Sequence, residues 1–261
     1  MQVEEGLVPS TDPAVALVGG TALTEETAVN YSFGFTSTIA DRLTLTADIY
    51  QIEVSDRIYR TGDISVPSQP GLPARSISFY TNALDVEHSG LDLVANTSFE
   101  FGSSSTIDAT LAYAYNTVEV TAQKQINGVN PVNDGLIEDI ENNYPEHRWV
   151  LTGNWFVGEK FNFLARANYY GEHYDERGRI GDPNDLSAQI SSTIYLDIEA
   201  GWQLNDNWRV VLGAVNVTDE FIDEIGPPNA NRLSVGLQYP RRTVANYEGG
   251  SWYLRASYNW Q

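Results

Sequence analysis

The stretch Leu91–Phe101, with the sequence LDLVANTSFEF, decides the fold class of this protein. Every second residue from Leu91 onward is apolar or small, and the residues between them include Asp92, Asn96 and Glu100. Successive side chains of an extended strand point to opposite sides, so one side of this segment is apolar and the other is polar. The sequence therefore predicts a β-strand that separates an apolar environment from a wet one.

The same two-residue period recurs along the chain and predicts about nine strands. Tight turns follow the first, third, fifth and seventh strands. Polar loops of roughly twenty to thirty residues follow the second, fourth, sixth and eighth strands, although connections between strands usually have about 4 to 6 residues. Short turns at one end and long loops at the other are typical of outer-membrane barrels. The predicted strands are 29–39, 43–54, 91–101, 107–115, 148–157, 161–170, 195–204, 208–217 and 252–260.

Aromatic residues form two predicted belts, one near the short turns and one near the long loops. Such belts mark the two interfaces of a membrane-spanning barrel. The alternative is that the aromatic residues fill a soluble core, but a soluble core does not explain the unequal loops. The turn-side belt comprises Phe99, Phe101, Trp155, Phe156, Phe161, Trp202 and Trp208, and the loop-side belt comprises Tyr50, Tyr113, Tyr115, Tyr169 and Tyr174.

Composition excludes several classes of protein. The formal net charge is −20, which argues against a nucleic-acid partner because phosphates bind to basic surfaces. The chain has no cysteine, so a disulfide framework and a thiolate metal site are excluded. The first twenty residues lack the basic and continuous apolar parts of a signal peptide, so we expect either a soluble protein or an export signal upstream of Met1.

Several segments resemble the C-terminal barrel of TonB-dependent outer-membrane receptors. LTEETAVNYSFGF at 23–35 and LTLTADIYQIEVSDRI at 43–58 look like a characteristic descending and ascending strand pair. YPEHRWVLTGNW at 144–155 and FLARANYYGEHYD at 163–175 resemble the next pair, and VVLGAVNVTDEF at 210–221 with WYLRASYNW resemble the last two strands. Each motif is weak by itself, but the ordered set covers most of the chain.

The resemblance implies an all-β fold, a transmembrane antiparallel up-and-down β-barrel. Residues 1–261 would form a partial barrel of about nine C-terminal strands out of roughly 22, without the plug domain. An open sheet with two unpaired edges is not stable in lipid, so we expect that these residues alone do not insert stably. The implied location is the bacterial outer membrane, in contact with its lipid and lipopolysaccharide.

The implied function is TonB-energised uptake of a scarce extracellular ligand, most commonly an iron–siderophore complex. The implied partners are an N-terminal plug domain, TonB acting through it, and the ligand; no cofactor is expected. Five tyrosines in or beside the long loops are the predicted ligand contacts, because aromatic and polar groups provide binding free energy in a concave mouth. These residues are Tyr59, Tyr80, Tyr144, Tyr174 and Tyr239.

Other sites have weaker support in the sequence. His88, His147 and His173 lie at or next to loop ends without metal-ligand spacing, so no metal site is predicted. An acidic run in one long loop offers oxygen ligands to a divalent cation, although a solvated loop is the commoner explanation of such a run. The acidic residues of this run are Asp134, Glu138, Asp139, Glu141 and Glu146.

Two other functions are kept as alternatives, and an enzyme is not expected. The chain has no G-x-S-x-G elbow, no H-E-x-x-H and no glycine-rich phosphate loop. A small passive pore or structural barrel needs its own signal peptide and an even strand count. A soluble β-sandwich adhesin requires that the apolar side of each strand meets a second sheet.

Overall fold

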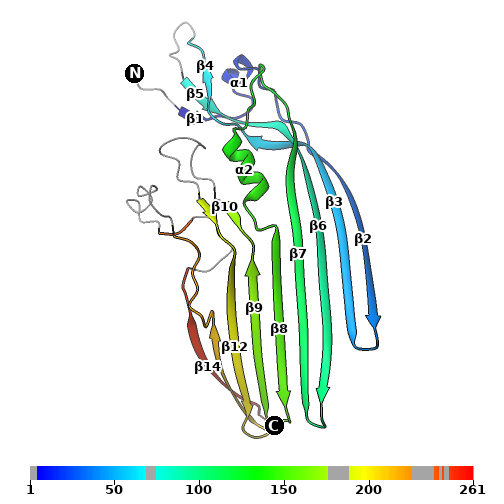
Figure 1. Cartoon of the computed structure of the whole chain (residues 1–261). Helices are drawn as coiled ribbons and strands as arrows, with labels where there is room; N and C mark the ends of the chain where they lie inside the picture. Colours follow the sequence, from blue (N-terminus) through cyan, green and yellow to red (C-terminus); the bar gives the residue numbers. More distant parts are fainter. Residues whose placement is uncertain are drawn as a thin grey trace.

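A computed structural model of the protein describes residues 5–68, 75–175, 188–224, 238–240, 243 and 247–260. Nine strands form one antiparallel sheet in the order β14-β13-β12-β9-β8-β7-β6-β3-β2, so each long strand pairs with its neighbours in the chain (Figure 1). The nine predicted strands are thereby confirmed. They are β2 (Thr27–Ile39), β3 (Leu43–Arg60), β6 (Tyr80–Phe101), β7 (Ser105–Gln123), β8 (His147–Val157), β9 (Phe161–Tyr170), β12 (Thr193–Gln203), β13 (Trp208–Val215) and β14 (Ser251–Tyr258).

The register of the sheet produces two chemically different faces. On one face, Ala109 is paired with Gly153, Gly153 with Ala165, and Ala165 with Ile198. One residue further along each strand, Asp108 is paired with Asn154 and Arg166 with Asp197. We call the side that includes Gly153 and Ala165 the apolar face and the side that includes Asp108 and Arg166 the polar face. Aligned alternation on neighbouring strands therefore gives the whole sheet these two faces.

The four short connections lie together at one end of the sheet, where the chain also ends (Figure 1). In the turn between β2 and β3, Ala40 and Asp41 both have positive φ angles of 50° and 55°, as a tight hairpin turn requires. Gly102 and Gly158 provide the positive φ angle in two other turns. The predicted segregation of short turns and long loops is confirmed.

The long connections at the opposite end contain short elements that the period-two pattern does not predict. α1 (Pro13–Leu17) packs against β4 (Ile64–Val66) and β5 (Arg75–Ser78) through buried Val15, Val66, Ile77 and Phe79. β1 (Glu5–Leu7) pairs in parallel with β5. α2 (Asp134–Asn142) and the hairpin of β10 (His173–Asp175) and β11 (Ala188–Ile190) lie beside this region (Figure 1). The loop end of the sheet is therefore ordered by small hydrophobic clusters.

Three strands are longer than predicted at their loop ends. β3 has 18 residues, which at about 3.3 Å each span roughly 60 Å. The register of β3 shifts between Val54 and Arg57, because Asp56 adopts a φ angle of 59°. This bulge reverses the alternation of faces, so the period-two pattern stops at Val54 although the strand continues to Arg60.

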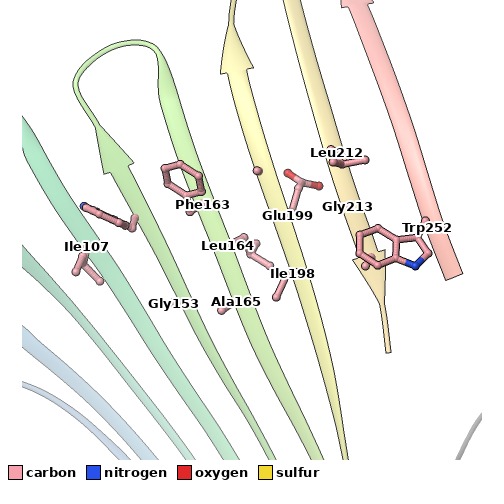
Figure 2. A pocket seen from close by; sticks show the side chains of 13 residues that line it. Ile107, Gly153, Phe163, Leu164, Ala165, Ile198, Glu199, Leu212, Gly213 and Trp252 are labelled. Atoms are coloured by element: carbon pink, nitrogen blue, oxygen red, sulfur yellow. The ribbon is translucent and has the colours of Figure 1, made fainter. Parts of the chain in front are cut away.

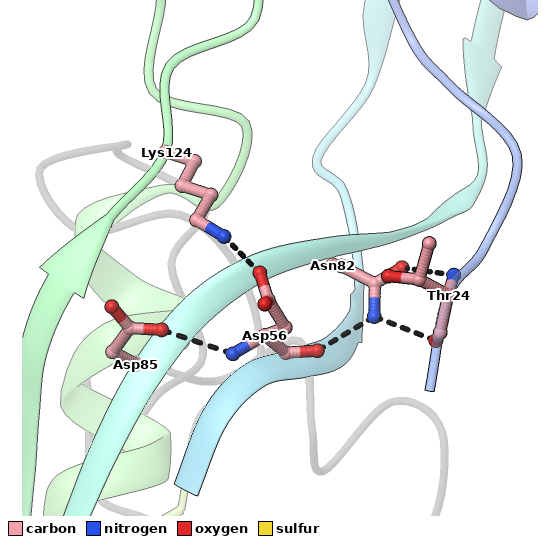
Figure 3. Close-up of polar contacts among 5 residues, drawn as sticks. All are labelled: Thr24, Asp56, Asn82, Asp85 and Lys124. Carbon is pink, nitrogen blue, oxygen red and sulfur yellow. Dashed lines mark hydrogen bonds and ion pairs between the residues drawn. The ribbon is translucent and has the colours of Figure 1, made fainter. Parts of the chain in front are cut away.

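A polar joint surrounds the bulge and connects four segments (Figure 3). The backbone N–H of Asp56 donates to Asp85 at 3.0 Å, and the amide of Asn82 donates to the carbonyl oxygen of Asp56 at 2.6 Å. Asn82 also donates to the carbonyl oxygen of Thr24 and accepts from its N–H, at 3.0 and 2.8 Å. Lys124 forms an ion pair with Asp56. The joint therefore fixes the direction in which β3 and β6 leave the wall of the sheet.

Within the part of the chain that the structure describes, both outer strands of the sheet have a free edge. Every residue of β2 and of β14 is exposed, and within the described residues each pairs with a single neighbour, β3 and β13 respectively. Long exposed edges have unpaired backbone groups that require further strands. The apolar face also meets no second sheet among the described elements, which does not agree with the sandwich alternative. Neither α1 nor α2 is long and apolar enough to cross a membrane.

Candidate functional site

A hollow of about 480 Å³ lies on the apolar face of the sheet (Figure 2). Trp155, Phe163 and Trp252 line it, and Gly153 leaves space on the same face. Glu199 also contributes to its lining, but its carboxylate lies on the polar face, where it accepts a hydrogen bond from the hydroxyl of Tyr253 at 2.7 Å. A ligand pocket needs polar groups that orient its ligand, and this hollow offers little besides hydrocarbon. We therefore place no imported ligand there.

A second cavity, of about 500 Å³, lies among the long loops. Leu17 of α1 and Ile64 of β4 provide apolar walls, and Asn127, Asn130 and Asn133 provide amide groups. The side chain of Asn133 is occupied because it caps α2 by accepting from the N–H of Leu136 at 2.9 Å. This cavity mixes apolar surface and neutral hydrogen-bonding groups, as small-molecule sites do.

A third cavity, of about 330 Å³, lies where α2, β8, β9 and the β10–β11 hairpin meet. Three carboxylates line it, from Glu138, Glu146 and Glu172, together with the imidazoles of His147 and His173. None of these five side chains has an ion pair among the described residues. The cavity is therefore polar and rich in groups that accept hydrogen bonds.

His173 is the most buried of these groups, with 3% of its surface exposed. Burial is the largest influence and lowers the pKa of His173 below its ordinary value, although the carbonyl of Gly171 and the carboxylate of Asp175 act in the opposite direction. The imidazole is therefore neutral at neutral pH, because burial penalises its charged form. His147 is exposed, and its ring shares a hydrogen bond of 2.9 Å with the hydroxyl of Tyr113.

The five tyrosines predicted as ligand contacts lie in three separate places. Tyr59 and Tyr80 lie at the loop ends of β3 and β6, in adjacent registers. Tyr144 is 69% exposed and lines the third cavity, whereas Tyr174 of β10 is only 8% exposed. Tyr239 is half-buried and lies 6.1 Å from Phe221 and 5.7 Å from Tyr247, measured between ring centroids. The five tyrosines therefore do not form one cluster, and a ligand role for each of them stays a prediction.

The loop-side aromatic belt is confirmed in part. Tyr113, Tyr115 and Tyr169 lie on the apolar face, where Tyr169 stacks on Trp149 with 5.4 Å between ring centroids. Tyr50 does not belong to this belt, because it pairs with Gly90 on the face that includes Asp92. Tyr174 does not belong to it either, because the short hairpin buries its ring. Both assignments were wrong because nearness to a long loop does not place a side chain on the apolar face. Tyr50 shares the alternation of Asp48, and Tyr174 belongs to a separate hairpin.

Polar side chains on the polar face contact one another across the strands. The amide of Asn168 donates to Asp197 at 3.1 Å, and Arg209 donates to Asn162 at 2.7 Å. Glu199 accepts from Tyr253 and also pairs with Arg255 at 3.4 Å. These contacts satisfy groups that an apolar environment would leave without partners. An apolar exterior with a connected polar interior is the arrangement expected of a membrane barrel wall.

Comparison with known proteins identifies the family. The profile described as "TonB dependent receptor-like, beta-barrel" matches residues 5–217. The chain belongs to this family. It is therefore a protein of the bacterial outer membrane, whose apolar face meets lipid and whose polar face lines the barrel interior. The family consists of receptors and transporters. A search of curated protein sequences finds no significant match.

Solved structures of TonB-dependent receptors and transporters share the fold. The FrpB iron transporter of Neisseria meningitidis aligns with a TM-score of 0.58 at 14% identity, over 92% of this chain and 32% of that one. The outer-membrane transporter YddB of Escherichia coli aligns with a TM-score of 0.58 at 12% identity, over 90% and 33%. A variant of the ferric enterobactin receptor PfeA of Pseudomonas aeruginosa gives 0.57 at 14% identity, over 92% and 32%. The chain spans about a third of these structures, and at such identities the likeness shows the fold.

Proposed function

We propose that this chain forms part of the wall and several external loops of a receptor that imports a scarce ligand across the outer membrane. The family match over residues 5–217 is the observation that carries this proposal. The loop end of the sheet supports it, because two cavities of about 500 and 330 Å³ lie there, within the size range of small-molecule sites.

An iron–siderophore complex is the ligand that we propose. The FrpB protein is described as an iron transporter and PfeA as a receptor for ferric enterobactin, and both share this fold. OprC, described as a copper transporter, also aligns, with a TM-score of 0.54. Iron chelates are therefore the first ligands to test, and copper is the first comparison.

The proposed partners are an N-terminal plug domain inside the barrel and TonB, which acts on that plug to release the ligand. The polar face supports a plug, because Asp48, Asp92 and Asp108 present charges to the interior. Outer-membrane lipid and lipopolysaccharide are the proposed neighbours of the apolar face. The large exposed side chains on that face, among them Trp155 and Phe163, support contact with lipid hydrocarbon.

Uptake of a radiolabelled ferric siderophore by intact cells under iron limitation tests the proposal. Cells that lack the gene should lose uptake, and cells that lack TonB should lose it to the same extent because import is energised. The copper chelate serves as the matched ligand. Uptake that persists without TonB and rises linearly with ligand concentration would instead favour the passive-pore alternative.

A further inference from the structure

Two hollows on the apolar face of the sheet join into one depression, which we call the apolar trough. One is the hollow of about 480 Å³ described above (Figure 2), and the other has about 420 Å³; Gly153, Ala165 and Ile198 line both. Phe163 lines the first hollow and Ala167 the second, on opposite sides of Ala165 along β9. The trough therefore follows the strands over four residues, which is about 13 Å.

Small residues form the floor of the trough, and large side chains form its walls. The register places Gly153 between Ala109 on one neighbouring strand and Ala165 on the other. Nothing lies within 4 Å of a Cβ atom built on Gly153, so the floor is open. Trp155 and Trp252 also line the trough and are 45% and 68% exposed, so their rings rise above this floor.

The trough lies within the surface that meets lipid. Ala165 and Ile198 are both exposed, so the described part of the chain leaves the trough uncovered. This face contacts the hydrocarbon of the outer membrane. Between apolar surfaces in a membrane the hydrophobic effect gives no preference, so close van der Waals packing decides which occupant is retained. The shape of the trough therefore selects its occupant.

The width of the trough favours a single hydrocarbon chain over a protein element. At its turn end the trough passes over Ala200, which is paired with Phe163 on one side and with Leu212 on the other. Adjacent strands are about 4.8 Å apart, so the backbones of Phe163 and Leu212 are only about 10 Å apart and their side chains narrow the gap. An α-helix with its side chains is about 10–12 Å wide and does not fit there.

The position of the trough indicates the leaflet that supplies the chain. Leu151 lines the loop-side hollow from the middle of β8, and Trp155 lines the other hollow two residues before β8 ends at Val157. Short turns of outer-membrane barrels face the periplasm, so the trough lies in the periplasmic half of the bilayer. In the β8–β9 turn, Lys160 is exposed and forms no ion pair among the described residues. A lipid phosphate is a suitable partner for its ammonium group.

We propose that the apolar trough binds one acyl chain of a phospholipid from the periplasmic leaflet. The chain lies over Gly153 and Ala165 and leaves the trough between Phe163 and Leu212, and the phosphate of the lipid contacts Lys160. The trough is on the outside of the wall. This lipid site is therefore independent of the imported ligand, and it stands even if the receptor does not import iron.

Photo-crosslinking of the full-length receptor in a mild detergent tests the site. The probe is a trace of phosphatidylethanolamine with a diazirine on one acyl chain, and mass spectrometry identifies the labelled peptides. Label should concentrate on β8, β9 and β12, and an excess of unlabelled phosphatidylethanolamine with the same chains should remove it. Label that spreads evenly over the apolar face, or that resists this competition, would overturn the proposal.

A matched pair of variants tests the fit of the chain. Ala165→Leu fills the floor of the trough, whereas Ala95→Leu adds the same side chain to the apolar face of β6, where Ala95 is paired with Leu111 outside the trough. Ala165→Leu should raise the dissociation constant of phosphatidylethanolamine about fivefold, which corresponds to about 1 kcal/mol of lost packing. Ala95→Leu should leave it unchanged. Equal dissociation constants in the two variants would contradict the site, and electrophoretic mobility without boiling confirms that each is folded.

Two further comparisons identify the source of the chain. Diacylglycerol with the same chains lacks the phosphate, so it should displace the probe less well than phosphatidylethanolamine does, and Lys160→Gln should abolish this difference. A difference that persists in Lys160→Gln would contradict the phosphate contact. Lipopolysaccharide that displaces the probe better than phosphatidylethanolamine, or crosslinks between two receptor copies through β8 and β9, would assign the trough to another occupant and overturn the proposal.

Discussion

His173 makes the β10–β11 hairpin sensitive to acid. Burial lowers the pKa of its imidazole below the ordinary value, so folding favours the neutral form. This contribution to stability is present above the unfolded pKa of about 6.5 and is lost as the pH falls through the lower folded value. We predict that hydrogen-exchange protection of β10 decreases between pH 7.5 and pH 5.

The control for this prediction is His147, which is exposed and lies at the start of β8. His173→Gln should remove most of the pH dependence of β10, because glutamine does not titrate. His147→Gln should retain it. If β10 is equally protected from hydrogen exchange at both pH values in the unmodified protein, burial of His173 does not make the stability of the hairpin depend on pH.

Gly213 provides the space for an aromatic ring on the polar face. A Cβ atom there would overlap the ring of Tyr253, whose hydroxyl donates to Glu199 at 2.7 Å. We predict that Gly213→Ala displaces this ring and destabilises the folded receptor by about 1–3 kcal/mol. Urea-induced unfolding in detergent, followed by tryptophan fluorescence, measures the change.

Gly153→Ala is the matched control for Gly213→Ala. Gly153 also lies inside a strand, but nothing stands within 4 Å of its missing Cβ. Alanine there should be neutral or should stabilise by up to about 1 kcal/mol, because glycine costs more backbone entropy on folding. Equal destabilisation by both substitutions would mean that the Tyr253 ring is not the cause.

At the scale of elements, Asn82 holds the joint at which β3 and β6 leave the wall. Its side chain forms three hydrogen bonds of 2.6 to 3.0 Å with backbone groups of Thr24 and Asp56. Asn82→Ala leaves these backbone groups without their partner, so we predict a loss of about 1–3 kcal/mol. Loss of hydrogen-exchange protection at the amide of Thr24 should accompany it.

Thr110→Ala is a suitable control for the joint, because it removes a single exposed hydrogen bond to Asn96 at 2.8 Å in the middle of the wall. Its effect should stay within about 0.5 kcal/mol. If the amide of Thr24 is protected equally in Asn82→Ala and in the unmodified protein, the joint does not hold this segment.

The elements differ in how well the sequence predicts them. The part of each strand that crosses the membrane was predicted, because alternation is preserved wherever one face meets lipid. The loop ends of β3 and β6 were not predicted, because the bulge at Asp56 reverses the alternation. Short elements such as α1 and β4 depend on each other through buried Val15 and Val66, and no local pattern predicts such contacts.

The sequence contains a signal for part of the third cavity. The dipeptides Glu146-His147 and Glu172-His173 flank one predicted hairpin, so antiparallel pairing alone brings them near each other. The contribution of Glu138 was not predictable in the same way. It reaches the cavity because α2 packs on β6 and β7 through buried Ile140 and Val86, a tertiary contact without a local pattern.

At the scale of the whole molecule, the two free edges determine whether the sheet persists in lipid. Among the described residues, β2 and β14 have no pairing strand along their outer edges, over 13 and 8 residues. Each unsatisfied group costs several kcal/mol in hydrocarbon. We predict that residues 1–261 expressed alone with an export signal do not form a protease-resistant species in the outer membrane.

Co-expression with further barrel strands tests whether the lack of pairing partners for β2 and β14 is the reason for this protease sensitivity. The rest of the barrel, exported as a separate chain, should pair with β2 and β14 and restore protease resistance and fast electrophoretic mobility without boiling. A soluble β-sandwich exported in the same way would provide no strand of the required length and should not restore them. Resistance of residues 1–261 in the absence of any partner would show that the sheet closes by another route.

The four tight turns also have a consequence for variation among relatives. Turns as short as Ala40–Arg42 set the register of each strand pair from one end of the sheet. The long loops at the other end therefore contribute little to the pairing of the strands. Insertions and deletions in the long loops are therefore tolerated without a change in the pairing of the strands. The surface that bacteriophages, antibodies and nutrients encounter is free to diverge rapidly, while the part embedded in hydrocarbon stays constant.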